Sequence, residues 1–492
     1  MLRKVRIILA VLFFAGITLL LAGIGNQWWG WMAKLQFLPS CLALNFAVIA
    51  GVLLLTLAFG RIYCSVICPM GVFQDIVIWI RRQAGLLLHK VNERKIRKYA
   101  ADKKAGKDVK KPSTIKREVK HFEFNKERWW VRYPVLVLTI AAIFAGLQVV
   151  VALIAPYSAY GRMVRTAVGA GSGESLAPAL IITAVVTFVV IVLCAWLWGR
   201  AWCNTVCPVG TVLGLVGRHP LMHIKIDESK CAACGRCGRG CKSSCIDMDN
   251  HTVDYSRCVD CFDCLGRCKE NALSFSLKPG SEAPDKGRRN FLAASAAIIG
   301  TSAVAKAVET DGGLAALLPK QEPERKGRLV PFGAKGEDNF YSHCTACQLC
   351  VSSCPNRVLK PSSDLEHLAQ PKMSYTDGFC RPECTICSNV CPAGAILPVK
   401  TREEKFNVRI GTARINEELC VVRTKGDKCG NCAAHCPAGA IRMVREEGLA
   451  NPVPAVIETR CIGCGECEYL CPARPVSAIV VDGLEEHQTR TV

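Results

Sequence analysis

Several kinds of redox and nucleotide site have no support in this sequence. Its nine histidines are scattered and no Cys-x2-Cys-His sequence occurs, so a covalently attached haem is not expected. No glycine-rich nucleotide fingerprint and no Ser–His–Asp pattern stands out. Flavin and nicotinamide chemistry are therefore not predicted.

Acidic residues are also in short supply. The chain has 41 Asp and Glu against 62 Lys and Arg, a net charge of +21. Such an excess can mark nucleic-acid binding, but residues 81–132 alone hold 18 Lys or Arg against 6 Asp or Glu. A basic block between two apolar stretches is better explained by the orientation of a membrane protein, so no nucleic-acid partner is predicted.

Cysteine, in contrast, is abundant and grouped. Of 31 cysteines, 24 fall into six runs of four. Two runs have the spacing Cys-x2-Cys-x2-Cys-x3-Cys, which is typical of bacterial ferredoxins that bind [4Fe-4S] clusters. Zinc sites use two Cys-x2-Cys pairs instead, and this grouping is not that of a disulfide framework. The two runs are Cys231, Cys234, Cys237, Cys241 and Cys258, Cys261, Cys264, Cys268.

The fourth cysteine of each run in such ferredoxins usually binds the other cluster. We therefore expect Cys268 to join the first three cysteines of the first run, and Cys241 to join those of the second. Cys245, four residues after Cys241, is a spare that could replace it. The usual proline after the fourth cysteine is absent, because Lys242 and Lys269 occupy these two places.

Four further runs lie in the last third of the chain, and each ends in Cys-Pro. Two of them have a longer first gap, which lengthens a loop without removing a ligand. The runs predict four more [4Fe-4S] clusters, six in all. For the fourth ligands we expect nested pairing, the first run with the fourth and the second with the third. The runs are Cys344, Cys347, Cys350, Cys354; Cys380, Cys384, Cys387, Cys391; Cys420, Cys429, Cys432, Cys436; and Cys461, Cys464, Cys467, Cys471.

Four apolar stretches predict membrane-spanning helices. By the positive-inside rule, the N-terminus, the basic stretch 81–132 and the chain after residue 199 lie on the cytoplasmic side of a bacterial inner membrane. The basic stretch is polar enough to be partly disordered. A short polar loop with Tyr157 and Tyr160 is expected between the third and fourth spans. The stretches cover residues 5–24, 42–60, 134–155 and 178–198.

Two of the spans end in copies of one motif, Gly-Arg-x-aromatic-Cys-x3-Cys-Pro-x-Gly, which begin at Gly60 and Gly199. The i, i+4 spacing predicts both thiols of a copy on one helical face. The four spans are thus expected to form two pseudo-symmetric hairpins, with all four thiols close together beside the first pair of cysteine runs. The thiols are those of Cys64, Cys68, Cys203 and Cys207.

Three interpretations of these four thiols are open. They can hold a metal or an iron–sulfur cluster, act as a dithiol redox pair, or be small apolar residues of a structural turn. Nearby Arg61, Arg200 and Tyr63 are candidates for quinone binding, although such residues more often anchor a span among lipid headgroups. Cys41 and Cys194 are expected to pack in the core.

A signal-like segment separates the first two cysteine runs from the last four. Paired arginines followed by Phe-Leu at 286–292, and then an apolar, Ala-rich run at 293–305, resemble a twin-arginine export signal. A fifth span is the second interpretation, and in both cases the rest of the chain faces the periplasm. A linker helix, the third interpretation, does not require this crossing.

The predicted fold is an α-helical membrane domain combined with α+β ferredoxin-like domains. Alternating segments at 223–226 and 273–277 predict half-buried strands beside the first two cysteine runs. The predicted domains are the four-span membrane domain 1–221, the cytoplasmic two-cluster ferredoxin module 222–280, the signal or anchor with its linker 281–326, and the periplasmic four-cluster domain 327–492.

These motifs together resemble a known family. Residues 1–280 are similar to NapH-type membrane ferredoxins, the family of the NosR, MauN and CcoG relatives, and residues 286–492 look like NapG/MauM-type exported ferredoxins. The resemblance implies a quinol dehydrogenase or electron-transfer subunit. It would pass electrons from the membrane quinone pool, through the clusters, to a periplasmic redox protein or reductase of nitrate or nitrous oxide type. An alternative, suggested by the CcoG-type relatives, is a maturation protein whose membrane-edge cysteines bind or reduce copper.

Overall fold

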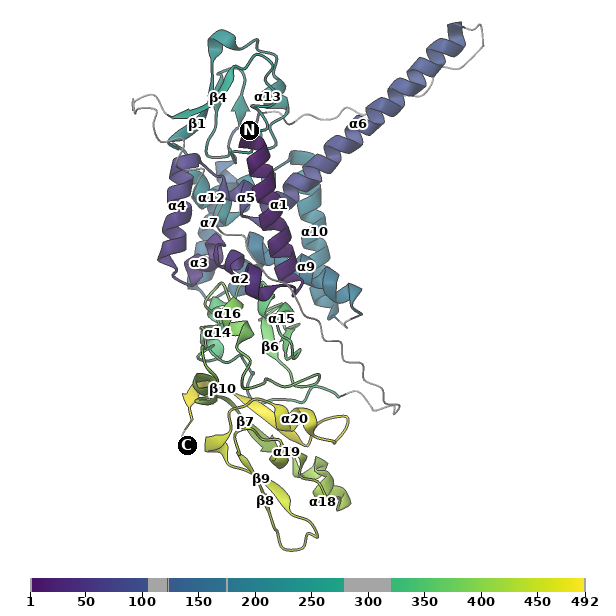
Figure 1. The fold of residues 1–492 in the computed structure, drawn as a ribbon, viewed down its shortest axis with the longest axis vertical. Helices are drawn as coiled ribbons and strands as arrows, with labels where there is room; N and C mark the ends of the chain where they lie inside the picture. Colours follow the sequence, from purple (N-terminus) through teal and green to yellow (C-terminus); the bar gives the residue numbers. More distant parts are fainter. Residues whose placement is uncertain (1, 105–121, 123, 174–175, 278–319, 491–492) are drawn as a thin grey trace.

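The computed structural model describes residues 2–104, 122, 124–173, 176–277 and 320–490. A bundle of helices lies in the middle of the molecule, and one cysteine-rich part lies at each end (Figure 1). The N-terminus is at the end that carries the first cysteine-rich part. The twin-arginine-like segment, and the fifth span that it was expected to form, fall outside the described residues.

Two helices of the bundle are long and apolar enough to cross a membrane, α1 (Leu2–Leu21) and α10 (Pro178–Trp198). Two other apolar helices are shorter, α4 (Phe46–Phe59) and α7 (Trp129–Phe144). Many of their large apolar side chains face outward, as in Val185 of α10, which is 52% exposed. This is the pattern of helices that contact lipid rather than water.

The second and third expected spans are shorter than the sequence predicted. The third, 134–155, is not one helix: Gly146 adopts a φ of 72° and separates α7 from α8 (Gln148–Ile154). The second, 42–60, is helical only over α4, because the Asn45 side chain accepts a hydrogen bond from a backbone amide of the first turn and caps the helix there.

The segment expected to be a polar loop between the third and fourth spans is a helix, α9 (Pro156–Gly171). Proline suits the first position of a helix because its missing N–H has no partner there. The Tyr160 ring packs between Phe14 of α1 and Phe73, with centroid distances of 5.4 and 6.2 Å. The loop prediction was wrong, and this segment belongs to the core of the bundle.

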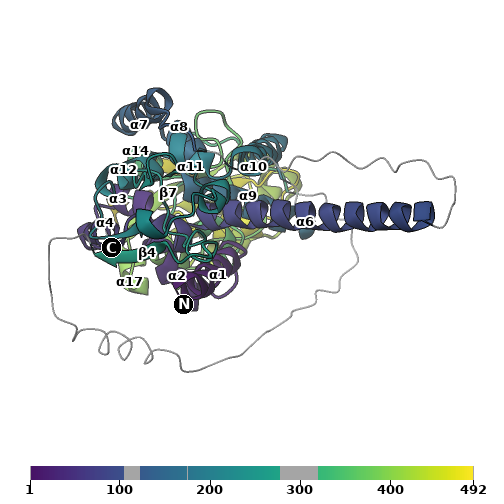
Figure 2. The same ribbon diagram turned by 90° about the horizontal axis from the view of Figure 1, so that it is seen from above.

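The basic stretch also differs from its prediction. Residues 81–104 continue a single 36-residue helix, α6 (Pro69–Lys104), which leaves the bundle (Figures 1 and 2). At 1.5 Å per residue it is about 54 Å long. Leu, Lys and Arg are good helix formers, and Glu93 pairs with His89 and Arg97 one turn away on either side. Partial disorder was therefore wrong for 81–104, and most of the remainder lies outside the described residues.

Short helices join the long ones at both ends of the bundle. The helices α2 and α3 lie at the end that faces the C-terminal part, and α5 and α12 lie near the first cysteine-rich part (Figure 1). They are α2 (Asn26–Lys34), α3 (Phe37–Leu42), α5 (Tyr63–Val66), α11 (Ala201–Thr205) and α12 (Pro208–Val216).

The first ferredoxin module, residues 222–277, is built on two small antiparallel sheets. β1 (Met222–Ile226) pairs with β4 (Leu273–Leu277), where the alternating pattern predicted strands. β2 (Ile246–Asp247) pairs with β3 (Thr252–Val253) between the two cysteine runs. A single turn of helix, α13 (Arg236–Arg239), lies within the first run, and the 3-10 turn Glu228–Lys230 directly precedes it.

The C-terminal domain, residues 320–490, contains three antiparallel strand pairs. One long pair spans the domain, and the two short pairs are hairpins that each lie between two cysteine runs. The strands are β5 (Leu359–Pro361), β6 (Pro371–Met373), β7 (Val408–Ile415), β8 (Ile441–Val444), β9 (Val453–Val456) and β10 (Ile479–Thr489). The helices are α14 (Glu337–His343), α15 (Leu349–Ser352), α16 (Ile386–Val390), α17 (Arg402–Phe406), α18 (Val421–Lys425), α19 (Asn431–Ala434) and α20 (Glu466–Leu470), with 3-10 turns at Glu417–Leu419 and Glu458–Arg460.

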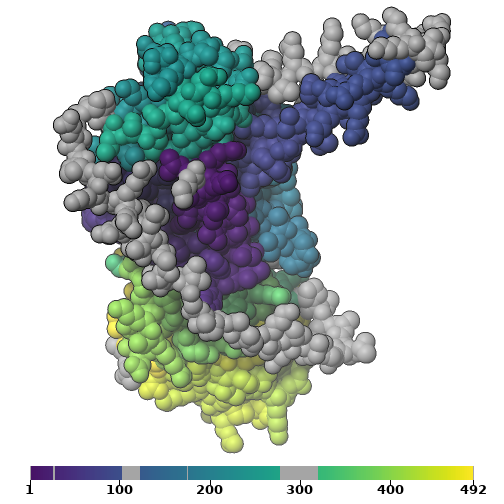
Figure 3. Space-filling view, turned by 45° about the horizontal axis from the view of Figure 1, so that its top comes forward, coloured from purple at the N-terminus to yellow at the C-terminus, as the bar shows by residue number. Residues whose placement is uncertain are grey.

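The C-terminal domain packs directly against the bundle (Figure 3). Its helix α16 contacts α2, and α15 contacts α1. Leu349 and Val390 of these two helices are buried in the same apolar cluster as Leu21 of the bundle. The domain is therefore held against the end of the bundle opposite the first ferredoxin module.

Candidate electron-transfer sites

The first ferredoxin module brings its two cysteine runs together as the spacing predicted. Cys231, Cys234, Cys237 and Cys268 line one cavity. The second group surrounds Cys264: burial, and after it three nearby thiols, raises the pKa of this thiol well above its usual value. Those thiols are Cys261, Cys258 and Cys241.

Cys245 lies beside the second group. Its sulfur is 3.5 Å from that of Cys241, and its thiol also interacts with Cys258. Its role as a replacement for Cys241 therefore stays a prediction.

The C-terminal domain pairs its runs differently from the nested arrangement expected from the sequence. Three cavities are each lined by three cysteines of one run and the last cysteine of the neighbouring run. The fourth group follows the same rule, because Cys350 interacts with the thiols of Cys344, Cys347 and Cys391. The cavities are lined by Cys380, Cys384, Cys387 with Cys354; Cys420, Cys429, Cys432 with Cys471; and Cys461, Cys464, Cys467 with Cys436.

The nested pairing was wrong because a hairpin lies between consecutive runs. The β5–β6 hairpin follows the first C-terminal run and returns the chain to the second, and the β8–β9 hairpin does the same for the third and fourth. The β2–β3 hairpin occupies the same place in the first module. The chain thus contains the same two-run unit three times.

The membrane-edge cysteines come together, but not on one face of a continuous helix. Cys64 lies in α5 and Cys203 in α11, whereas Cys68 and Cys207 fall just after these helices and directly before the prolines that begin α6 and α12. The helix breaks there because proline lacks the N–H that an uninterrupted helix needs. All four side chains are buried, and electrostatic interactions connect the Cys207 thiol to the other three. We call this group the membrane-edge centre.

The two arginines of the duplicated motif cross over between its copies. Arg61 of the first copy donates from Nη2 to the backbone carbonyl of Cys203 in the second, at 3.1 Å. Arg200 of the second copy donates from Nη1 to the carbonyl of Cys64 in the first, at 2.8 Å. Both side chains are fully buried. They therefore face the membrane-edge centre, not the lipid headgroups.

The last glycine of each motif copy makes this crossing possible. A Cβ at Gly71 would clash with the carbonyl of Cys64, and one at Gly210 would clash with that of Cys203. The same two positions also contact the arginine of the other copy. The repeated glycine thus leaves room for the backbone of its own copy to approach that arginine.

Tyr63, the third candidate for quinone binding, is also enclosed by protein. Its hydroxyl donates to Gln36 Oε1 at 3.2 Å and accepts from the backbone N–H of Phe37 at 3.0 Å. Of the two lone cysteines, Cys41 packs against the core of the bundle and is half-buried, as is Cys194 in α10.

The first ferredoxin module touches both motif copies at equivalent points. A Cβ at Gly60 would meet the carboxylate of Asp260, and a Cβ at Gly199 would meet the backbone carbonyl of Lys242. Both glycines have positive φ values, 76° and 67°. Asp260 lies between two cysteines of the second run, and Lys242 follows Cys241. The ligand loops of that group are therefore seated on the membrane-edge centre.

Lys242, one of the residues in place of the usual proline, fastens this contact. Its carbonyl accepts from the backbone N–H of Arg200 at 2.8 Å. Its ammonium pairs with Asp75 at 2.8 Å and with Asp263 at 3.4 Å. Asp75 also binds Arg200 and Arg6, at 2.8 and 3.0 Å. Sequence reasoning missed Asp75, and the missing proline was the signal that pointed to Lys242.

The C-terminal domain brings a cysteine group to the other end of the bundle. The carbonyl of Cys347 lies against Gly161 of α9, where a Cβ would be too close. Tyr157, one turn earlier, is buried and interacts with the thiols of Cys347 and Cys391. Tyr160 of the same helix contacts Phe73 near the start of α6. The helix α9 therefore lies between this group and the membrane-edge centre.

One continuous buried cluster runs through all three parts of the molecule. It includes Val259 of the first module, Cys68 of the membrane-edge centre, and Leu349 of the C-terminal domain. Cys261 and Cys347 pack against the same cluster. The cysteine groups at the two ends of the bundle are thus connected by close-packed protein.

The cysteine groups suit a cluster better than a single ion. In the parts of the chain that the structure describes, no three His, Cys, Asp or Glu side chains gather as ligands of one metal ion. The ferredoxin cysteines instead surround cavities and carry only sulfur donors, as [4Fe-4S] clusters require.

The comparisons with known proteins agree with this chemistry. A family model described as a 4Fe-4S binding domain matches residues 43–86 and 180–227, so each match covers one copy of the membrane-edge motif. A 4Fe-4S dicluster domain model matches residues 425–474 of the C-terminal domain. No solved structure matches the chain. The chain therefore binds iron–sulfur clusters.

Curated relatives match the two halves of the chain separately. The methylamine utilization ferredoxin-type protein MauM of Methylobacillus flagellatus is 35% identical over 22% of this chain and 47% of its own length. The ferredoxin-type protein NapG of Escherichia coli is 32% identical over 32% of this chain and 66% of its own length. NapH of the same organism is 28% identical over 42% of this chain and 55% of its own length.

The chain thus spans between about half and two thirds of the length of these relatives. The apolar helices and the match to NapH indicate association with a membrane. The chain is thus similar to ferredoxin-type 4Fe-4S proteins, with a NapH/MauN-like part fused to a NapG/MauM-like part.

Proposed function

We propose that this protein oxidises quinol in the membrane and carries electrons through six [4Fe-4S] clusters to a periplasmic reductase system of nitrate or nitrous oxide type. The 24 cysteines of the six runs are the proposed ligands, and the membrane-edge centre is a redox centre between the two ferredoxin parts. The N-terminus and the first module are assigned to the cytoplasm, and the C-terminal domain to the periplasm.

The observation that carries this proposal is the continuous path through the bundle. A hydrocarbon core of about 30 Å separates the two faces of a membrane, and electron tunnelling weakens steeply with distance. The membrane-edge centre lies on the packed path between the two ferredoxin parts, because Cys261 and Cys347 both pack against the buried cluster that contains Cys68. A scaffold with purely structural clusters has no need of such an alignment.

The arginines explain how thiolates can be kept inside the bundle. An uncompensated buried charge is costly, and a buried charge is tolerated where it is paired and hydrogen-bonded. Arg61 lies 3.9 Å from the Cys64 sulfur, and Gln74 donates to the Cys203 sulfur at 3.2 Å. Both groups would donate to the negatively charged sulfurs of thiolates that hold an iron–sulfur group. The bound group would supply one-electron chemistry at this point.

The burial of the four membrane-edge thiols also bears on the alternative that the protein handles copper. Each of the four thiols is 5% exposed or less. A protein that receives and releases copper needs at least one thiolate that the metal can reach, whereas a resident redox group is best enclosed. The geometry therefore favours electron transfer over metal handling.

The proposal is tested by iron content, spectroscopy and topology measured together. Anaerobically purified protein should hold about 24 iron atoms in the six ferredoxin sites, four for each cluster. Low-temperature EPR signals should appear when quinol is added. A reporter that works only in the periplasm should be active when fused after Val492. Clusters that chemical reductant reduces but quinol does not would contradict quinol as donor, and an inactive reporter would contradict the periplasmic acceptor.

A further inference from the structure

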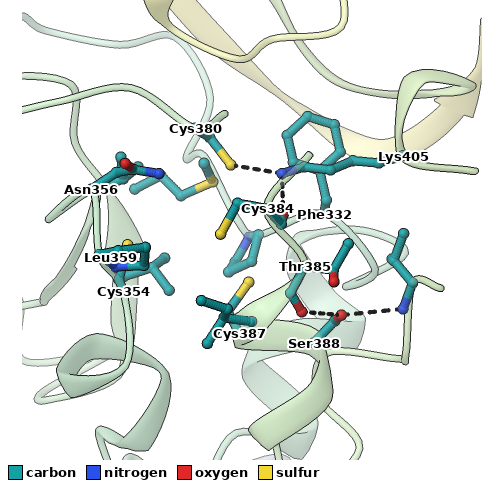
Figure 4. Close-up of a pocket in the computed structure, with 16 residues that line it drawn as sticks. Phe332, Cys354, Asn356, Leu359, Cys380, Cys384, Thr385, Cys387, Ser388 and Lys405 are labelled. Carbon is teal, nitrogen blue, oxygen red and sulfur yellow. Dashed lines mark hydrogen bonds between the residues drawn. The ribbon is translucent and has the colours of Figure 1, made fainter. Parts of the chain in front are cut away.

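A buried lysine lies against the sulfurs of one C-terminal site. Lys405, on α17, is 3% exposed. Its ammonium donates to the Cys380 sulfur at 3.2 Å and to the backbone carbonyl of Cys384 at 2.6 Å (Figure 4). It also donates to the backbone carbonyl of Arg381 at 2.6 Å. An ammonium has three donors, so all of them are satisfied inside the protein.

The local sequence explains why this lysine points inward. Thr401 caps α17 by accepting from the amide of Glu404 at 3.1 Å. The exposed side chains of Arg402 and Glu403 occupy the outer face of this single turn. Lys405 is left on the inner face, where its ammonium also lies 4.9 Å from the centroid of the Phe332 ring.

The charge of Lys405 has no carboxylate to balance it. None of the ion pairs among the described residues includes it. Burying an ammonium without an opposite charge is expensive. The negative charge within reach is that of the site itself, formed by Cys354, Cys380, Cys384 and Cys387, which line one cavity with Lys405. A cluster held by four thiolates supplies that charge.

We infer that Lys405 raises the reduction potential of the cluster held by Cys380, Cys384, Cys387 and Cys354. Reduction adds one negative charge to a cluster, and a fixed positive charge in a low-dielectric site stabilises the reduced form more than the oxidised one. Hydrogen bonds to cluster sulfurs and local charge are known determinants of this potential. Lys405 thus sets the potential of the cluster through its charge and hydrogen bond, without being a ligand.

We expect the shift in potential to be confined to this cluster, because other kinds of group contact the sulfurs of the neighbouring sites. Backbone amides donate to the sulfurs of Cys436 and Cys471, at 3.3 Å in each case. The cations near these two sites, Lys320 and Arg409, donate to the backbone carbonyls of Cys471 and Cys461 at 3.4 and 3.2 Å. In the group of Cys350, the polar side chains that interact with the sulfurs, Tyr157 and Thr345, are hydroxyl-bearing and not cationic. The cluster beside Lys405 should therefore accept electrons from the cluster that docks on the bundle, which favours flow away from the membrane.

The test is a redox titration of full-length protein, followed by EPR with chemical reductant and mediators. The variants are Lys405→Met and, as control, Lys400→Met, whose exposed side chain lies on the same segment. With iron content unchanged, Lys405→Met should move the potential of one cluster to a more negative value and leave the others in place. Lys400→Met should move none.

An unchanged set of potentials in Lys405→Met, with full iron content, would overturn the inference. Should this variant lose iron, Lys405→Gln keeps a donor for the two carbonyls without the charge, and the same two outcomes then apply to it. The inference rests on the cluster assignment of the proposed function, but not on the donor. Failure of quinol to reduce the protein would therefore leave this titration unaffected.

Discussion

The two copies of the membrane-edge motif share a backbone but not a charge distribution. In each copy the arginine reaches the carbonyl of the other copy's first cysteine. Arg200 is also held by the carboxylate of Asp75, whereas the position that matches Asp75 in the second copy is Gly214. A Cβ at Gly214 would clash with Arg132. The positive charges of Arg61 and Arg132 repel each other there.

This difference separates what the two arginines do. Arg200 is part of an ion-pair network that fastens the first ferredoxin module to the bundle through Lys242. Arg61 is in none of the ion pairs among the described residues and donates to Asn204 Oδ1 and to the carbonyls of Ser256 and Cys203. The buried carboxylate of Asp260 also interacts with it electrostatically. We expect the thiolates of the membrane-edge centre, together with Asp260, to balance the charge of Arg61. The repeated motif thus sets the geometry of both copies, whereas the residues that follow it, Asp75 and Gly214, set their charges apart.

The largest expected effect comes from removing the carboxylate of Asp75, which holds Arg200, Arg6 and Lys242. Asp75→Asn leaves Arg200, Arg6 and Lys242 buried without their shared partner. Breaking a buried ion pair costs about 3–5 kcal/mol, so the melting temperature in detergent should fall sharply and the first module should become sensitive to protease. Glu93→Gln, in an exposed pair on α6, should change stability by no more than about 0.5 kcal/mol. Equal effects of the two substitutions would contradict the assignment.

The two residues that replace the usual proline offer a second comparison. Lys242→Pro removes an ammonium that binds two carboxylates, Asp75 and Asp263. We expect it to loosen the first module from the bundle and destabilise the protein by about 2 kcal/mol or more. Lys269→Pro, at an exposed position, should be almost neutral. Limited proteolysis measures both, and similar behaviour of the two variants would show that Lys242 does not fasten the module.

The last glycine of each motif copy tests whether the two copies are structurally equivalent. Gly71→Ala and Gly210→Ala each place a methyl group against a backbone carbonyl of their own copy. Both should cost about 1–3 kcal/mol and displace the arginine of the opposite copy. Gly51, with nothing within 4 Å of its Cβ position, is the matched control. Thermal unfolding of the three variants tests this, and a large loss in only one of the two motif variants would break the symmetry argument.

The smallest expected effect concerns the sulfur ligands. Gln74 donates to the Cys203 sulfur, and the matching residue of the second copy is Leu213. Gln74→Leu makes the first copy like the second and removes one hydrogen bond, worth about 1 kcal/mol. The potential of the membrane-edge centre should shift to a slightly more negative value, with stability nearly unchanged. A positive shift would reverse the assigned role of Gln74.

The sequence predicted local chemistry far better than it predicted contacts between distant segments. Cysteine spacing is a local signal, so the six runs and the crossed pairing within residues 231–268 were accessible. The pairing in the C-terminal domain depends on the β5–β6 and β8–β9 hairpins, which are only three or four residues long on each side. Segments so short leave little periodicity to recognise.

Other differences arose where one local signal outweighed another. The i, i+4 spacing of Cys64 and Cys68 suggested a helix, but Pro69 ends it. High charge at 81–104 suggested disorder, although its Leu, Lys and Arg residues are strong helix formers. The hydrogen-bond partners of Arg61, Arg200 and Lys405 are distant in sequence or belong to the backbone, so no sequence pattern predicts them.

The most direct test of the relay is the extent to which quinol reduces the clusters when the membrane-edge centre is removed. Cys64→Ser and Cys203→Ser should still allow chemical reductant to reduce all six ferredoxin clusters, but electrons from quinol should reach fewer of them. Cys194→Ser, at the lone cysteine of α10, should behave like the unaltered protein. Full and equally fast reduction by quinol in the Cys64 and Cys203 variants would contradict the relay, and loss of bound copper in those variants alone would favour metal handling.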